Sequence, residues 1–109
     1  DYDREMAFVA VRPRAAGGEE GLGVARLIRD DATGHGEFAV VVLSAMKGQG
    51  LGAHLMERLF DWARSVGIRR VEGQVLADNR PMLAFVRKLG FEMRRSAEDE
   101  EVMEVWREV

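Results

Sequence analysis

The spacing of apolar residues changes near the middle of the chain. Before residue 44, apolar residues form three short runs rich in Val, Ile and Phe, separated by turn-forming segments. From Leu51 onward they recur every three or four residues, the spacing of one face of an α-helix. Consecutive strands joined by turns favour an antiparallel meander, whereas a strand, a helix and a strand favour a parallel crossover. The pattern predicts an α/β (α+β) domain built on a mixed sheet.

The spacing of apolar residues and the positions of turn-forming residues together predict where each strand and helix lies in the sequence. Strands are expected at 6–11, 22–29 and 38–43, a helix at 51–66, a strand at 69–76, a helix at 81–89, and a last hairpin of 91–95 with 102–106. A loop is expected over 12–21. The first strand is an uninterrupted apolar run and is therefore expected to be buried on both faces.

The first helix is predicted to be amphipathic. One stripe contains Leu51, Leu55, Leu59, Trp62, Ala63 and Val66, and the polar side contains His54, Glu57, Arg58, Asp61 and Arg64. Gly67 is expected to end this helix. The acidic run at 98–101 is predicted to be a solvated turn.

Composition narrows the possible chemistry. The chain has 109 residues, 47% of them apolar, no cysteine and a formal net charge of −3, which predicts one small domain. The lack of cysteine excludes disulfide scaffolds, cysteine zinc sites and thiol nucleophiles. The two histidines, His35 in an exposed turn and His54, lie far apart, so no metal is expected. The charge argues against nucleic acid, and no apolar run is long enough to span a membrane. A cytoplasmic protein is expected.

The segment from Lys47 to Gly52 contains three alternate glycines between the best strand and the best helix. Glycines let the backbone approach a ligand closely, and the N–H groups of a helix N-terminus bind anions, so the segment predicts a phosphate or pyrophosphate site. A tight turn without a ligand is the alternative. A dinucleotide fingerprint fits Gly48, Gly50 and Ala53, but an antiparallel meander precedes it, and a P-loop lacks its Gly-Lys-Ser/Thr triplet.

Two motifs resemble the GNAT superfamily of N-acetyltransferases. The segment from Val42 to Gly52 resembles its acyl-CoA-binding signature, and the segment from Asn79 to Phe91 resembles its Asn-to-Gly-Phe motif. The resemblance implies acetyl transfer from acetyl-CoA to an amine in a ternary complex. It also implies that the co-substrate contacts Val40, Val42, Lys47, Gly48, Gln49, Gly50, Leu51, Gly52, Ala53, Asn79 and Phe85. Asn79 is also expected to cap the second helix, and for Phe85 a place in the core is favoured over contact with the co-substrate.

The amino-acid sequences of several segments are similar to those of one subgroup, bacterial protein lysine acetyltransferases joined to an acyl-CoA-synthetase-like region. That similarity implies a protein lysine as the acceptor, with acyl-CoA synthetases as typical partners. Two residues depart from the family pattern. Lys47 stands where the family has Arg or Gln, so the planar set of N–H hydrogen-bond donors is lost. Val86 stands where many members have a Tyr proposed to protonate the departing thiolate.

Glu37 is the candidate general base, since its position resembles that of the carboxylate base in lysine-acetylating members. An exposed glutamate at a strand edge is the alternative interpretation. Because Val86 cannot donate a proton, a non-catalytic acyl-CoA-binding sensor is kept as a second hypothesis.

The family fold begins with a strand and two helices that have no counterpart in the sequence. These elements with their loops would take about 40 residues. Residues 1–109 are therefore expected to be one acetyltransferase domain truncated at its N-terminus. The loss of these helices would expose apolar surface, and a homodimer could cover it.

Overall fold

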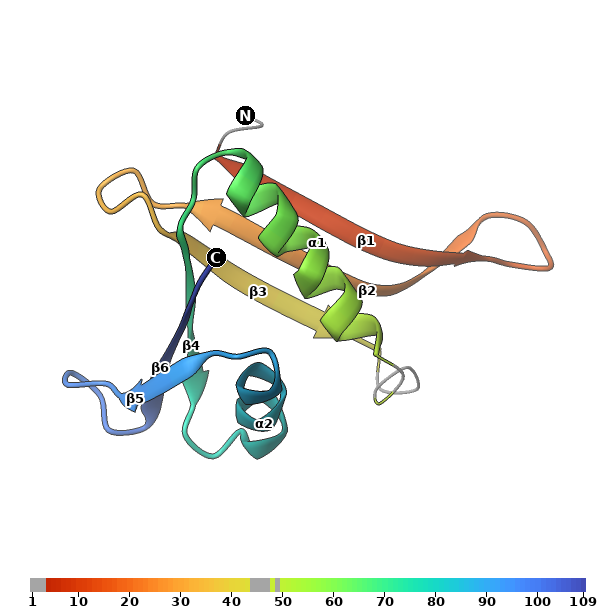
Figure 1. Cartoon of the computed structure of the whole chain (residues 1–109). Coiled ribbons are helices and arrows are strands. Elements are labelled where there is room, and N and C mark those ends of the chain that lie inside the picture. The colour runs from red at the N-terminus through yellow and green to blue at the C-terminus, as the bar shows by residue number, and fades with distance from the viewer. Residues whose placement is uncertain (1–3, 44–47, 49) are drawn as a thin grey trace.

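The computed structural model describes residues 4–43, 48 and 50–109, which form one mixed sheet and two helices (Figure 1). In chain order the elements are β1 (Glu5–Pro13), β2 (Glu19–Arg29), β3 (Gly36–Val42), α1 (Leu51–Ser65), β4 (Arg70–Leu76), α2 (Arg80–Lys88), β5 (Glu92–Arg95) and β6 (Val102–Glu108). The strand order is β1-β2-β3-β4-β6-β5, and only the β3–β4 pair is parallel. The predicted meander, parallel crossover and C-terminal hairpin are confirmed.

The first hairpin is longer than its sequence indicates. The loop expected over 12–21 is wrong at both ends, because β1 continues to Pro13 and β2 begins at Glu19. Pro13 is tolerated since β1 is the outer strand of the sheet, where a missing N–H costs no ladder bond. Gly17 and Gly18, with φ angles of 98° and 78°, make the short turn between the strands.

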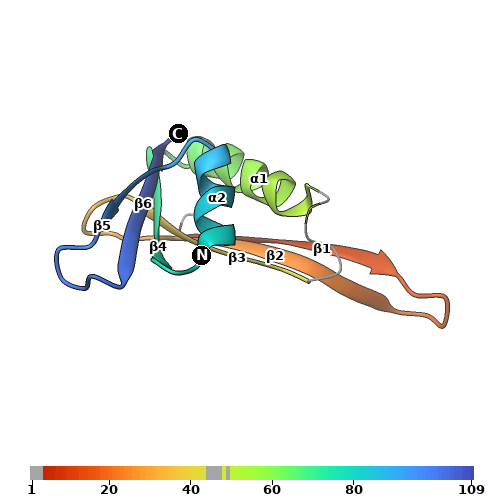
Figure 2. The same ribbon diagram turned by 90° about the horizontal axis from the view of Figure 1, so that it is seen from below.

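The prediction that the first strand is buried on both faces is also wrong. Alternate residues of β1 are exposed, among them Val9 at 61% and Val11 at 44%. The reason is that both helices lie on the same side of the sheet (Figure 2), so the other face of the meander has no described element over it. An apolar run at a sheet edge reads like a buried strand in sequence, yet only one face of it is covered.

Helix α1 covers the meander with a wider apolar face than the predicted stripe. Leu55, Leu59 and Ala63 are buried as expected, and Met56 and Phe60 are completely buried beside them. Three further members of the stripe are only half-buried: Leu51, Trp62 and Val66. The predicted polar side is confirmed as exposed or half-exposed. Phe60 is covered from the C-terminal half of the chain, by the Phe91 ring and by the Arg107 guanidinium of β6, which lies 4.3 Å from the centre of the Phe60 ring.

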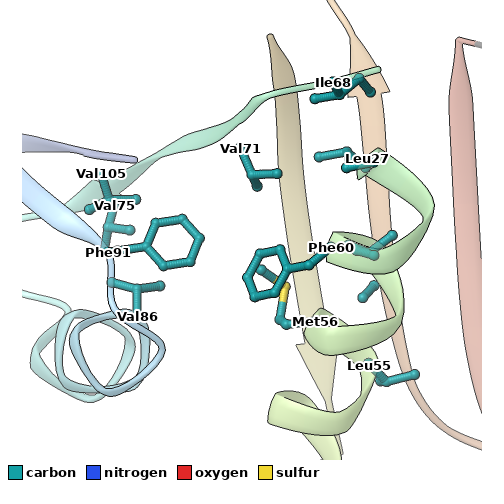
Figure 3. Packing of buried hydrophobic residues seen from close by; sticks show 13 residues of the cluster. Leu27, Leu55, Met56, Phe60, Ile68, Val71, Val75, Val86, Phe91 and Val105 are labelled. Carbon is teal, nitrogen blue, oxygen red and sulfur yellow. The ribbon is translucent and has the colours of Figure 1, made fainter. Parts of the chain in front are cut away.

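The core joins the meander half of the molecule to the C-terminal half. Phe60 of α1 faces Phe91, which follows α2, with ring centroids 6.0 Å apart (Figure 3). Val75, Val86 and Val105 pack behind Phe91 and are buried. No described helix is long and apolar enough to cross a membrane. The acidic turn at 98–101 is exposed as predicted.

The burial of Leu59 generates a stability prediction. Leu59→Ala removes a fully buried side chain from α1 and should lower the free energy of unfolding by about 2–5 kcal/mol. Leu76→Ala is the matched control because the Leu76 side chain is 58% exposed, and it should change stability by less than about 1 kcal/mol. Urea unfolding monitored by circular dichroism measures both. Equal losses in the two variants would contradict the placement of the core.

Candidate functional site

The central feature of the site is that β3 and β4 are paired only where they begin. Their parallel ladder contains two registers, Gly36 with Val71 and Glu37 with Glu72. Beyond this point β3 stays with β2 and β4 stays with β6 over its whole length. The two strands therefore diverge (Figure 1), and beyond Glu37 the facing edges of β3 and β4 are not paired with each other. We call the region between these two edges the split; its closed end lies at Glu37 and its open end beyond Val42.

The edge of β3 that faces the split carries free backbone groups. The Leu43 N–H donates to the Leu22 carbonyl of β2 at 2.9 Å. Backbone groups of successive strand residues point to opposite sides, so those of Val40 and Val42 point away from β2 and toward the split. The two residues predicted to bind through their backbone thus have donors and acceptors available to an extended ligand.

The N-terminus of α1 lies at the open end of the split. Gly50 caps this helix with a φ of 80°, no side chain caps it, and the first turn contains no acidic residue. Gly48 also has a positive φ, of 84°, and a Cβ at either glycine would meet nothing within 4 Å. The positive end of the helix is therefore open to an anion. Lys47 and Gln49 lie outside the described residues.

The first turn of α1 contacts α2 and β3 at this same end. A Cβ placed on Gly52 would lie 3.2 Å from two ring atoms of Phe85 and 3.6 Å from the Val42 Cγ2. Phe85 is half-buried and packs against the core, as the sequence favours. Leu51 and Ala53 are half-buried in the same turn. The fold thus brings together residues from two motifs that are separated by about 30 positions in the sequence.

Asn79 begins α2 directly after β4. Its side-chain oxygen accepts a hydrogen bond from the Met82 N–H at 3.3 Å, so the predicted N-cap is confirmed. Because α1 follows β3 and α2 follows β4, both helices begin beyond the carboxyl ends of two parallel strands. Ligand sites of open α/β sheets lie in this position. Contact between Asn79 and a ligand stays a prediction.

A polar cavity of about 260 Å³ lies on the other sheet face, beside the closed end of the split. Glu37 lines this cavity, its side chain is exposed, and no ion pair joins it to the residues that the structure describes. Glu72 lies opposite Glu37 on β4 and is held by the His35 Nδ1 at 3.1 Å and the Arg70 Nε at 3.5 Å. Of the two neighbouring carboxylates, Glu37 is the one available to a ligand.

The sequence did not identify the remaining walls of this cavity. They come from Arg70, Gln74, Arg94, Glu104 and Trp106, which lie on β4, β5 and β6. The alternation of β4 puts its polar residues on one face, but the partners of that face follow only from the β4–β6 register. His35 was expected to be exposed in its turn. It is instead half-buried, because it reaches across to Glu72.

Val86 is completely buried in the core behind Phe91, and Figure 3 shows it beside Val75 and Val105. Its isopropyl group carries no proton that could be donated. Among residues 4–43, 48 and 50–109, no group of three or more acidic, His or Cys side chains is placed to hold a metal ion.

The arrangement has three connected parts. The glycine-capped N-terminus of α1 lies at one end, a strand edge whose backbone groups have no partner among the described residues runs along the middle, and an exposed carboxylate lies at the closed end. A long molecule with a phosphorylated head and an extended polar arm fits this arrangement, with its far end delivered beside Glu37.

Comparison with known proteins finds similar chains. A curated relative, the acetyltransferase PA5475 of Pseudomonas aeruginosa, is 35% identical over 99 residues, which are 91% of this chain and 53% of the relative. The GNAT domain of PAT from S. lividans superposes with a TM-score of 0.85 at 26% identity, over all of this chain and 63% of that one. A cAMP-binding acyltransferase from Mycobacterium smegmatis has a TM-score of 0.79 and 29% identity, over all of this chain and 32% of that one.

The chain spans about half the length of the curated relative it matches. A family model described as the Acetyltransferase (GNAT) family matches residues 1–91, which is most of the chain and contains both motifs. On the match of this model, together with the split sheet, the chain belongs to the GNAT family of acetyltransferases.

Proposed function

We propose that this protein transfers an acetyl group from acetyl-CoA to the amine of a protein lysine side chain. The observation that carries the proposal is the split between β3 and β4, which connects the open N-terminus of α1 to the exposed Glu37 carboxylate. Acetyl-CoA has the matching parts in the same order, a pyrophosphate, an extended arm with amide groups, and a reactive acyl end.

The residues of the split fit this co-substrate. The N–H groups at the start of α1, with Gly48 and Gly50, bind the pyrophosphate, since no side chain of the described residues occupies their space. The free backbone groups of Val40 and Val42 pair with the amides of the arm, as an added strand would. Asn79 has one amide nitrogen left to donate, because its oxygen caps α2. Acetyl-CoA supplies the acetyl group in activated form, as a thioester.

The acceptor amine must lose a proton before it can attack. A lysine ammonium with a pKa near ~10.4 is neutral in only about one molecule in a thousand at pH 7, so a base is required. Glu37 takes this proton, and the free amine nitrogen then bonds to the acetyl carbon. As the amide forms, the carbon–sulfur bond breaks and the second proton of the nitrogen is released to water. Sulfur leaves as thiolate, which a thiol pKa near ~8.5 makes accessible, and therefore a buried valine at position 86 does not prevent the reaction.

A cationic acceptor side chain suits the cavity at the closed end. Glu72 and Glu104 are each already paired with an arginine, at 3.5 and 2.8 Å, whereas Glu37 has no such partner among the described residues. An ammonium group entering the cavity therefore meets an uncompensated carboxylate. The acceptor proposed from the subgroup resemblance is an acyl-CoA synthetase with a reactive lysine.

Release of thiol from acetyl-CoA tests the proposed activity. Release that depends on an added lysine-containing protein supports the transferase. If acetyl-CoA binds but no protein, peptide or small amine causes thiol release, the protein is a non-catalytic acyl-CoA sensor, a function that the absence of a proton donor at Val86 favours.

Glu37→Gln should lower kcat/KM for the acceptor by about 10²–10⁴-fold, since it removes the base but preserves the shape of the side chain. The dissociation constant of acetyl-CoA should stay the same. Glu5→Gln is the matched control, because Glu5 lies two strands away in the same row and on the same sheet face. Unchanged turnover in Glu37→Gln would rule out the assigned base.

Gly52→Ala should weaken acetyl-CoA binding by about tenfold. The added Cβ would lie 3.2 Å from the Phe85 ring and displace either the ring or the first turn of α1, at a cost of ~1–3 kcal/mol. Isothermal titration calorimetry measures the affinity.

The double variant Gly52→Ala, Phe85→Leu is the control for this contact. A leucine side chain leaves room for the methyl group, so the double variant should recover most of the affinity. Equal affinity in the native protein and Gly52→Ala would show that this contact does not shape the site.

A further inference from the structure

The first residues beyond the last β3–β4 pair are Phe38 and Gly73. Continuing the register of Glu37 with Glu72 by one step would place them opposite each other, on the side of the sheet that carries the helices. A Cβ built on Gly73 would lie 2.7 Å from the Phe38 Cε1 and 3.1 Å from its Cδ1. The aromatic ring of Phe38 therefore occupies the space above Gly73 and fills the closed end of the split.

The Phe38 ring is held in this position by other rings. Its centroid lies 5.3 Å from that of Phe91, at an interplanar angle of 56°, and Phe91 lies 6.0 Å from Phe60. Phe91 and Phe60 are 5% and 0% exposed, so the rings behind Phe38 are themselves fixed in the core (Figure 3). Phe38 cannot move back into the core to make room, because that space is already packed.

We propose that Phe38 determines the length of the acyl group that the protein accepts. The inference rests on the proposed function, in which the arm of the acyl-CoA lies along β3 with its head at the open end of the split. Its acyl end then points toward the closed end, where the next side chain on the helix side of β3 is Phe38. The acetyl group fits in front of the ring, and each further methylene group of a longer acyl chain collides with it.

The expected discrimination is large. One methylene group too many in a closed apolar pocket changes selectivity by about 10–200-fold. Gly73 is needed for this position of Phe38, since any side chain at residue 73 would displace the Phe38 ring. Glu37 lies on the other sheet face at the same end, so the amine that it deprotonates would attack the acyl carbon at this end.

The test compares binding and turnover of acetyl-CoA and butyryl-CoA in Phe38→Ala. Calorimetry gives both dissociation constants without any acceptor present, and thiol release gives kcat/KM with the acceptor. Phe38→Ala should raise the affinity for butyryl-CoA relative to acetyl-CoA by at least about tenfold, and the kcat/KM ratio should rise in the same direction.

Phe8→Ala is the matched control. Phe8 is another half-buried phenylalanine on the same sheet side, but it lies on β1 beneath the Arg58 guanidinium, away from the split. This variant should leave the preference between the two acyl-CoAs unchanged. Phe38→Leu, which removes less of the side chain, gives a folded alternative if the alanine variant does not fold, and it should raise the ratio by a smaller factor.

Three results would overturn the inference. The native protein could bind acetyl-CoA while Phe38→Ala and Phe38→Leu keep the native ratio of affinities for butyryl-CoA and acetyl-CoA. In that case Phe38 does not determine the accepted acyl length, although the proposed function stands. If Phe8→Ala raises the ratio as much as Phe38→Ala, the effect is general loosening of the core. If the native protein binds neither acyl-CoA, the proposed function fails and the inference fails with it.

Discussion

The pairing of β4 with β6 is the interaction on which the rest of the site depends. β4 pairs with β6 at seven registers and with β3 at only two. β4 stays paired with β6 where it parts from β3. The sheet therefore opens between β3 and β4 while its other strand pairs stay intact. The opening exposes one backbone edge of β3 between two helix N-termini. The strand edge and the helix N-terminus that we propose bind the co-substrate, and the candidate base, thus all border one division in the sheet.

The closed end of this division is shaped by glycines that face large side chains. A Cβ on Gly36 would lie 2.9 Å from two Leu27 atoms, and a Cβ on Gly73 would lie 2.7 Å from the Phe38 ring. Leu27 is completely buried under α1, so neither it nor the backbone can shift cheaply. The two glycines therefore allow the strands to meet at one point while large side chains pack around that point.

Local signals in the sequence were reliable where the structure is local. The change in apolar spacing predicted α1, and Asn79 caps α2 as expected. The phosphate site expected from the alternate glycines stays a prediction. Errors occurred where burial depends on a distant element. The apolar run of β1 is an edge strand with one exposed face, Phe60 is covered by Phe91 and Arg107 of the C-terminal half, and His35 contacts Glu72 across the parallel pair.

The sequence by itself determined the elements, their order and the family resemblance, because each depends on residues close together in the chain. Glu37 as the candidate base came from that resemblance and stays a prediction. Only the tertiary structure decided that β3 and β4 part after two registers, that Phe38 closes the resulting split over Gly73, and that Glu37 is the available carboxylate beside a Glu72 held by His35 and Arg70. These features depend on strand register, and register is set by the packing of both halves of the molecule at once.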